Sequence, residues 1–203
     1  MAVTKILAFA GSLRKDSFNK KLVKIAAQGA EEAGAEVTYI DLRDYPMPIY
    51  DGDLEAADGI PENALKLKQI FREHQGLLIA SPEYNSSISA ALKNAIDWVS
   101  RSEKGEPMLA CYTGKVAAIM AASPGALGGL RGLVTVRSIL GNIQVTVIPD
   151  QIAISSASDA FAEDGSLKDA KQQDKVKKIG AALATSAARL CERELKSGVA
   201  ARN

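Results

Sequence analysis

Polar and cationic side chains gather in one short stretch near the start of the chain, Gly-Ser-Leu-Arg-Lys-Asp-Ser-Phe-Asn, residues 11–19. Ser12, Ser17 and Asn19 offer hydrogen-bond donors, and Arg14 supplies a guanidinium fork that suits a phosphate group. Because a helix is predicted directly after this stretch, the unpaired N–H groups of its first turn would also face an anion. The pattern therefore predicts a phosphate site that needs no metal. In the alternative interpretation, Ser17 or Asn19 only caps the helix and Arg14 is a solvated surface charge.

A second polar stretch, Ser-Pro-Glu-Tyr-Asn-Ser-Ser, begins at residue 81 and follows a short apolar run. Pro82 restricts the residue before it and limits motion of the loop. Tyr84 offers an aromatic face that could flank a flat ring, and backbone N–H groups near Asn85 could bond the heteroatoms of such a ring. Ser86 or Ser87 is expected to cap the next helix in either case, and the alternative is that the stretch is only an ordinary turn followed by this cap.

A third stretch, Ser-Pro-Gly-Ala-Leu-Gly-Gly at residues 123–129, carries three glycines that allow the backbone to approach a ligand closely. Two nucleotide fingerprints are missing from the chain. No G-x-G-x-x-G follows the first predicted strand, and no G-x-x-x-x-G-K-[ST] occurs. Neither a dinucleotide site of the Rossmann type nor a P-loop is supported.

Strands and helices alternate along the chain, and the three stretches lie between them. Short apolar runs predict strands, and apolar residues at helical spacing predict helices. The expected strands are residues 3–10, 36–42, 76–80, 115–122 and 143–148. The expected helices cover residues 22–33, 62–74 and 88–99, a segment from the glycine-rich residues 125–132 to about 140, and residues 176–191. Residues 43–61, which carry several prolines and glycines, are expected to form a long loop without regular structure.

This alternation predicts a parallel sheet covered by helices on both faces, within a single domain over residues 1–203. The core is expected at about residues 3–190, followed by a frayed C-terminal tail. Ligands of such sheets bind outside the carboxyl ends of the strands, where strand order reverses. The loops after strands one, three and four, which are the three polar stretches, are therefore expected to form the site.

Taken together, the three motifs resemble those of the NADPH-dependent FMN reductase family, over about residues 3–190. The resemblance implies an α/β flavodoxin-like three-layer sandwich with strand order 2-1-3-4-5. It implies that the first motif holds the phosphate of FMN, through Ser12, Arg14, Ser17 and Asn19. It further implies that the second motif lies along the isoalloxazine and the third borders the flavin, through Pro82, Glu83, Tyr84, Asn85, Ser123 and Gly125.

The family resemblance also implies a function and an assembly. We expect an FMN-dependent oxidoreductase that transfers hydride from NADPH or NADH to a quinone or similar small acceptor by a ping-pong mechanism. No acid–base catalytic residue is assigned, because the flavin carries the chemistry. The family forms dimers or tetramers with flavin near a subunit boundary, and the apolar, proline-rich residues 44–51 resemble a loop that can approach a neighbour's site. We therefore expect a homodimer or homotetramer.

Other functions remain open at this point. The acceptor could instead be free FMN, an azo dye or chromate, which the sequence does not separate. A flavodoxin-like electron carrier is the alternative from another class, but such carriers tend to use a charged face to steer their partners. This chain has 25 basic and 24 acidic residues and a net charge of +1. The same balance argues against a nucleic-acid or membrane-surface partner.

The remaining chemistry-bearing residues favour structural roles. His74 is the only histidine and ends a predicted helix, so helix capping is favoured over catalysis, and no metal site is expected. Cys111 and Cys191 have no C-x-x-C partner and are expected to pack in the core, as a reduced, cytoplasmic protein would allow. Trp98 and Tyr112 are expected in the core or at an interface. The lysine-rich residues 168–178 are expected to form a solvated helix face.

Overall fold

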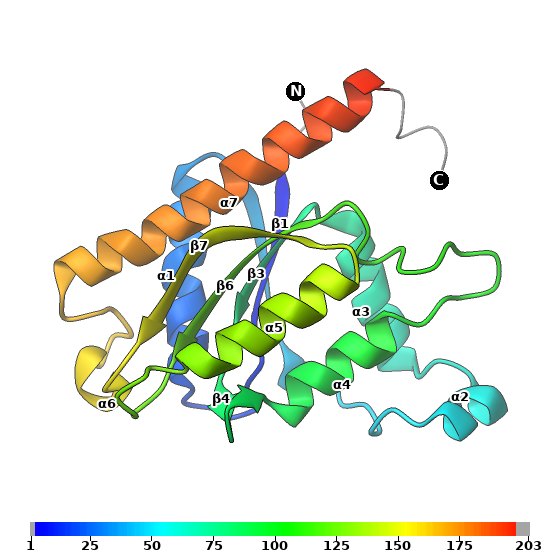
Figure 1. The fold of residues 1–203 in the computed structure, drawn as a ribbon, viewed down its shortest axis with the longest axis horizontal. Helices are drawn as coiled ribbons and strands as arrows, with labels where there is room; N and C mark the ends of the chain where they lie inside the picture. The colour runs from blue at the N-terminus through cyan, green and yellow to red at the C-terminus, as the bar shows by residue number, and fades with distance from the viewer. Residues whose placement is uncertain (1–2, 198–203) are drawn as a thin grey trace.

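The computed structural model describes residues 3–197, and their side chains through residue 190. Five parallel strands form its central sheet, in the order β2-β1-β3-β6-β7 (Figure 1). Their bounds are β1 (Lys5–Ala10), β2 (Glu36–Asp41), β3 (Gly76–Ala80), β6 (Val116–Ala122) and β7 (Thr146–Ile154). Counted within this sheet, the order is 2-1-3-4-5, so the α/β flavodoxin-like fold is confirmed.

Helices cover both faces of the sheet, as predicted (Figure 1). Successive side chains of a strand point to opposite faces, and in β1 Ile6 and Ala8 join one apolar cluster while Leu7 and Phe9 join the other. The first cluster lies under α1 (Phe18–Glu32) and α7 (Ala170–Ser197). The second lies under α3 (Glu62–Glu73), α4 (Ala90–Val99) and α5 (Leu130–Asn142).

The helices α1 and α7 cross with their backbones in contact. A Cβ atom added to Gly180 of α7 would lie 1.8 Å from the carbonyl oxygen of Ala26 in α1. A Cβ atom added to Gly29 of α1 would lie 2.0 Å from the carbonyl oxygen of Lys177. Both distances are far below any real carbon–oxygen contact, so this crossing requires a residue without a side chain on each helix.

The prediction that residues 43–61 lack regular structure is wrong. A 3₁₀ turn, η1 (Leu42–Asp44), and a short helix, α2 (Gly52–Asp58), lie there. The carboxylate of Asp51 accepts a hydrogen bond from the N–H of Asp53 at 2.8 Å, which caps α2 at its start. None of the residues of α2 is buried. A helix without a buried face shows no apolar periodicity, so the sequence gives no sign of it.

The fifth strand was predicted at residues 143–148 and is found at Thr146–Ile154 instead. Its pairing with β6 shifts register between Ala117 and Ile119. Residues 148–150 of β7, with Pro149 in the middle, form the β-bulge at this point. Proline cannot donate to a sheet ladder and is tolerated in edge strands and at bulges. Pro149 therefore marks an irregularity within the strand rather than its end. Beyond β7 lies a one-turn helix, α6 (Ala157–Ala160).

The core predictions are confirmed where the structure describes them. The side chains of Trp98, Cys111 and Tyr112 are buried, whereas that of Cys191, like the predicted C-terminal tail, lies outside the described residues. Burial raises the pKa values of the Cys111 thiol and the Tyr112 hydroxyl. Most lysines in the segment 168–178 are exposed, as expected. In the described part of the chain, no helix is long and apolar enough to cross a membrane.

His74 lies at the C-terminal end of α3, where capping was predicted, and is buried. Its Nδ1 lies 2.6 Å from the carbonyl oxygen of Ile70, in the last turn of the helix, and its Nε2 lies 2.8 Å from the hydroxyl of Thr38. A carbonyl oxygen only accepts, so Nδ1 is the donor. The ring thus ties the end of α3 to β2.

Candidate functional site

The three polar loops meet at the carboxyl edge of the sheet, around a hollow of about 130 Å³. Eight of the ten predicted site residues line it, and the other two, Asn85 and Gly125, each follow a lining residue directly. The lining residues are Ser12, Arg14, Ser17, Phe18, Asn19, Pro82, Glu83, Tyr84, Ala122, Ser123 and Pro124. A second, more open hollow of about 340 Å³ adjoins it and shares Ser12, Arg14 and Tyr84.

The first loop presents uncommitted donors at the start of α1. Ser17 is the N-cap residue of this 15-residue helix, but its hydroxyl makes no capping hydrogen bond. Arg14 is exposed and forms no ion pair with the described residues. The first turn of α1 also contains no acidic side chain that would occupy its free N–H groups. These groups together fit the phosphate of FMN, because a helix N-terminus, a hydroxyl and a guanidinium all favour a dianion.

Asn19 differs from its neighbours in this loop, because both ends of its amide are already bonded. Its Nδ2 donates to the carbonyl oxygen of Ala122 at 2.9 Å, and its Oδ1 accepts from the N–H of Ala122 at 2.9 Å. The Asn19 side chain is buried. It therefore joins the first loop to the end of β6, where the third loop begins.

The second loop is a two-stranded hairpin, β4 (Glu83–Tyr84) and β5 (Ser87–Ile88), where a simple polar turn was predicted. Asn85 and Ser86 form its turn with φ angles of 52° and 66°. Two successive left-handed residues define a type I′ turn, whose twist matches the flanking strands. The turn leaves the Tyr84 side chain 53% exposed beside both hollows, where it can flank a flat ring.

The carboxylate of Glu83 points to α5 and is nearly buried. It accepts hydrogen bonds from the N–H groups of Arg131 at 3.0 Å and Gly132 at 3.2 Å, and it pairs with the guanidinium of Arg131 at 2.8 Å. The N-cap position of α5 is Gly129, with φ 93°, which offers no side chain for capping. Glu83 thus caps α5 from another segment, so its carboxylate is already bonded to α5.

Ser89, which is not among the predicted site residues, also fixes the first loop. Ser89 is the N-cap of α4, accepting from the N–H of Leu92 at 3.1 Å, so the expected caps Ser86 and Ser87 are wrong. Its hydroxyl also donates to the carbonyl oxygen of Gly11. The apolar periodicity was counted from Ile88, which placed Ser89 inside the predicted helix, whereas α4 begins at Ala90.

The third loop brings backbone rather than side chains to the edge. The Ser123 hydroxyl accepts from the N–H of Gly125 at 3.2 Å. A Cβ atom added to Gly129 would lie 2.7 Å from the Cβ of Ala121, so the loop packs directly on the end of β6. The loop can therefore border a ligand closely without bulky side chains in between.

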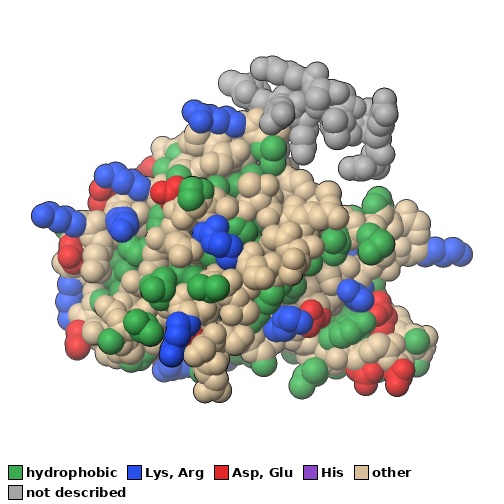
Figure 2. Space-filling model, in the orientation of Figure 1, with side chains coloured by type: hydrophobic (Ala, Val, Ile, Leu, Met, Phe, Trp, Pro, Cys, Tyr) green, Lys and Arg blue, Asp and Glu red, His purple; other side chains and the backbone are tan. Residues whose placement is uncertain are grey.

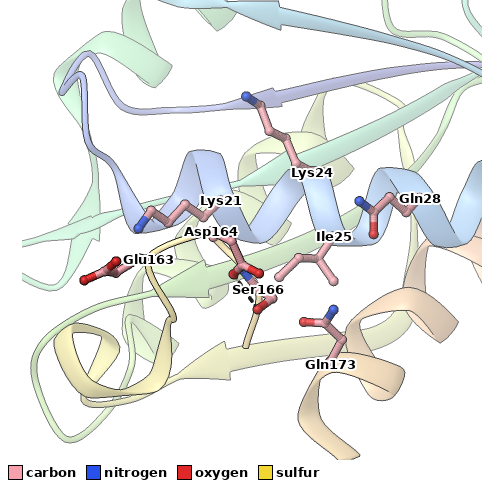
Figure 3. Close-up of a pocket in the computed structure, with 9 residues that line it drawn as sticks. Lys21, Lys24, Ile25, Gln28, Glu163, Asp164, Ser166 and Gln173 are labelled. Atoms are coloured by element: carbon pink, nitrogen blue, oxygen red, sulfur yellow. Dashed lines mark hydrogen bonds between the residues drawn. The ribbon is translucent and has the colours of Figure 1, made fainter. Parts of the chain in front are cut away.

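A further hollow, of about 360 Å³, lies along α1 on the far side of this helix from the sheet edge loops (Figure 3). Charged and amide side chains line it, but Lys24 points away from the segment that carries Asp164 and Ser166. The ammonium of Lys24 lies instead 4.7 Å from the ring centre of Tyr39. Asp164 is bonded by Ser166, which lowers its pKa. None of the predicted site residues lines this hollow.

Comparison with known proteins decides the family. The family model described as NADPH-dependent FMN reductase matches residues 4–159, which include all three loops. The chain belongs to this family. It is therefore an NAD(P)H-dependent oxidoreductase with FMN as its cofactor, as the resemblance implied.

Individual relatives agree with this assignment. The chain is 34% identical over 183 residues to a probable NADPH:quinone oxidoreductase of Oryza sativa, covering 87% of this chain and 88% of the relative. It is 35% identical over 171 residues to an NAD(P)H-dependent FMN reductase of Pseudomonas aeruginosa, covering 84% and 88%. A solved flavoenzyme NAD(P)H:(acceptor) oxidoreductase of Paracoccus denitrificans matches with a TM-score of 0.77 and 30% identity, over 92% of this chain and 98% of that one.

Proposed function

We propose that this FMN reductase family member passes hydride from NADPH or NADH to a quinone or similar small acceptor. The observation that carries the proposal is the hollow at the start of α1, where the Ser17 hydroxyl and the Arg14 guanidinium have no side-chain partner among the described residues. The name of the Oryza sativa relative supports a quinone as acceptor, and that of the Pseudomonas aeruginosa relative supports reduction of FMN by NADPH or NADH. Bound FMN supplies the hydride transfer chemistry, and the protein binds and orients.

Each loop has a separate task in this proposal. Ser12, Arg14 and Ser17 anchor the phosphate at the α1 N-terminus. The backbone of the hairpin at Pro82, Glu83 and Asn85 and the ring of Tyr84 hold the isoalloxazine, and Ser123 and Gly125 border it. We assign no acid–base residue, because the proton that must accompany the hydride when a quinone becomes a hydroquinone is supplied by water at the open hollow.

The phosphate assignment is tested by Arg14→Ala. Loss of a charge-assisted hydrogen bond is expected to weaken FMN binding by about 1.5–3 kcal/mol, while the helix N–H groups remain. Riboflavin carries no phosphate, so its affinity should be unchanged. The ratio of the riboflavin dissociation constant to the FMN dissociation constant should therefore fall. Fluorescence titration of the apoprotein with both flavins measures this difference. Wild-type FMN affinity in the variant would mean that the phosphate lies elsewhere.

The order of events follows from the open hollow beside Tyr84. We propose that nicotinamide and acceptor use the same exposed face, so that they cannot occupy it together. Oxidised nicotinamide then leaves before the acceptor binds, which is a ping-pong scheme. Double-reciprocal plots at several quinone concentrations are expected to be parallel. Intersecting lines would require both substrates on the enzyme at once. Absence of NADPH oxidation with every quinone, free flavin, azo dye or chromate tried would favour an electron carrier.

We further propose a homodimer or homotetramer. The exposed residues of α5 include Leu130, Val134, Ser138 and Gly141, and the one exposed charge in its first turn, Arg131, is paired with Glu83. Val134 is 69% exposed, and the face over α5 carries scattered apolar side chains with lysine or arginine side chains between them (Figure 2). The loop at residues 44–51 presents Ile49, which is 85% exposed, while Pro48 is held by Trp98 and Asn94. A second copy of this nearly neutral chain fits both surfaces without charge repulsion.

Sedimentation of the FMN-loaded protein at micromolar concentration tests the assembly. Val134→Glu and Ile49→Glu each place a charge on one of the two surfaces. If a surface is used in assembly, the substitution on it should lower the sedimenting mass. A lower mass for each of the two variants would indicate two interfaces, as in a tetramer. A boundary at monomer mass for the unsubstituted protein would refute the proposal.

A further inference from the structure

The amide of Asn19 occupies a position that a sheet neighbour would otherwise take. On one side, β6 pairs with β3, and the last paired residues are Ala80 and Met120. The N–H of Ser81 then binds the carbonyl oxygen of Met120, after which the chain leaves the sheet. Two residues further along β6, the N–H and the carbonyl of Ala122 both bind Asn19.

The need for this contact follows from burial. Ala122 is 4% exposed, and a buried backbone N–H or carbonyl without a partner is costly. On its other side β6 pairs with β7, where Ala122 lies opposite Ile154. The Asn19 side chain thus continues the hydrogen bonding of the sheet at the point where β3 has ended. Few side chains other than an amide can donate and accept at once in this way.

We propose that Asn19 is a positioning residue that ties the phosphate loop to the third loop, and is not itself a ligand of the FMN phosphate. This inference rests on the proposed function. Ser17 and Arg14 have uncommitted donors in the same hollow, whereas both amide atoms of Asn19 are bonded. The residue after Ala122 is Ser123, so loss of the Asn19 bonds releases the loop that borders the ring.

The two roles predict different responses to a flavin without phosphate. A phosphate ligand contributes nothing to riboflavin binding, so its removal would weaken FMN alone. A residue that fixes the third loop against the first supports the ring as well as the phosphate. Removal of Asn19 is therefore expected to weaken FMN and riboflavin by similar factors.

The experiment compares Asn19→Ala with Arg14→Ala by fluorescence titration of the apoproteins with FMN and riboflavin. For Asn19→Ala we expect both dissociation constants to rise about tenfold, with their ratio unchanged within twofold, as the loss of about 1.4 kcal/mol implies. Arg14→Ala should change the ratio. Amide hydrogen exchange at Ala122 in the apoprotein should also be faster in Asn19→Ala than in either the wild type or Arg14→Ala.

Selective loss of FMN binding in Asn19→Ala, with unchanged exchange at Ala122, would overturn the inference and make Asn19 a phosphate ligand. If this variant does not fold, Asn19→Ser is measured in the same way, because it adds no charge beside the phosphate and is too short to keep both bonds to Ala122. Failure of the proposed function shows differently: the wild type would then not prefer FMN to riboflavin, or Arg14→Ala would leave that preference intact.

Discussion

Replacement of Glu83 by alanine tests whether the second loop is held by its carboxylate bonds to α5. The change removes acceptors from the N–H groups of Arg131 and Gly132, which are 3.0 and 3.2 Å away, and leaves the first turn of α5 without a cap. Loss of an N-cap costs about 0.5–2 kcal/mol. The ion pair with Arg131, a side chain that is 59% exposed, adds about 0.2–1 kcal/mol. We expect Glu83→Ala to lower the free energy of unfolding by roughly 1–3 kcal/mol.

Arg131→Ala is the matched control, because it removes the ion pair and keeps both cap hydrogen bonds to the backbone. Its expected cost is about 0.2–1 kcal/mol. Urea unfolding of the two apoproteins at one protein concentration gives the comparison. Flavin titration should follow the same order, since only Glu83→Ala frees the hairpin that carries Tyr84. Equal destabilisation by the two substitutions would show that the charge pair, and not the cap, holds this loop.

Two further predictions concern stability. Gly180→Ala places a Cβ atom 1.8 Å from the Ala26 carbonyl and should destabilise by about 1–3 kcal/mol or more, whereas Gly141→Ala, which meets nothing within 4 Å, should stabilise by up to about 1 kcal/mol in thermal unfolding. Burial alone would raise the pKa of Glu106. Hydrogen bonds from the N–H of Glu103 and from the side chains of Lys68 and Arg72 outweigh burial and hold this pKa at about 2. The free energy of unfolding that this lowered pKa contributes is fully present above about 4.3, the pKa of a glutamate in the unfolded chain, and is lost as pH falls toward 2. Glu106→Gln should therefore flatten the acid limb of stability against pH, and an unchanged slope would contradict this.

The sheet and the place of the site follow from patterns that the sequence shows directly. Apolar runs such as Gly76–Ala80 are buried on both faces, and right-handed crossovers leave few strand orders. The polar loops fall between those runs, so their meeting at one edge follows from the topology. The family motifs then add the ligand, which patterning alone does not identify.

The direction of a side chain within a loop is not visible in the same way. Glu83 and Asn19 lie in the predicted motifs, yet their polar atoms bind α5 and β6. Their partners are 48 and 103 residues away in the chain, so local spacing gives no sign of them. The fifth strand was predicted to end at residue 148 for a related reason, since only its pairing with β6 shows that it continues past Pro149.

The crossing of α1 with α7 has a consequence for synthesis. The helix α1 is made early, and α7 begins roughly 140 residues later, an interval of about 7–28 s at translation rates of 5–20 residues per second. Throughout that time the apolar face of α1 that α7 later covers is exposed to solvent. Gly29 lies on this face, at the point where the backbone of α7 later packs. The nascent chain is thus exposed to chaperones and to aggregation at the same helix whose first turn later receives the phosphate.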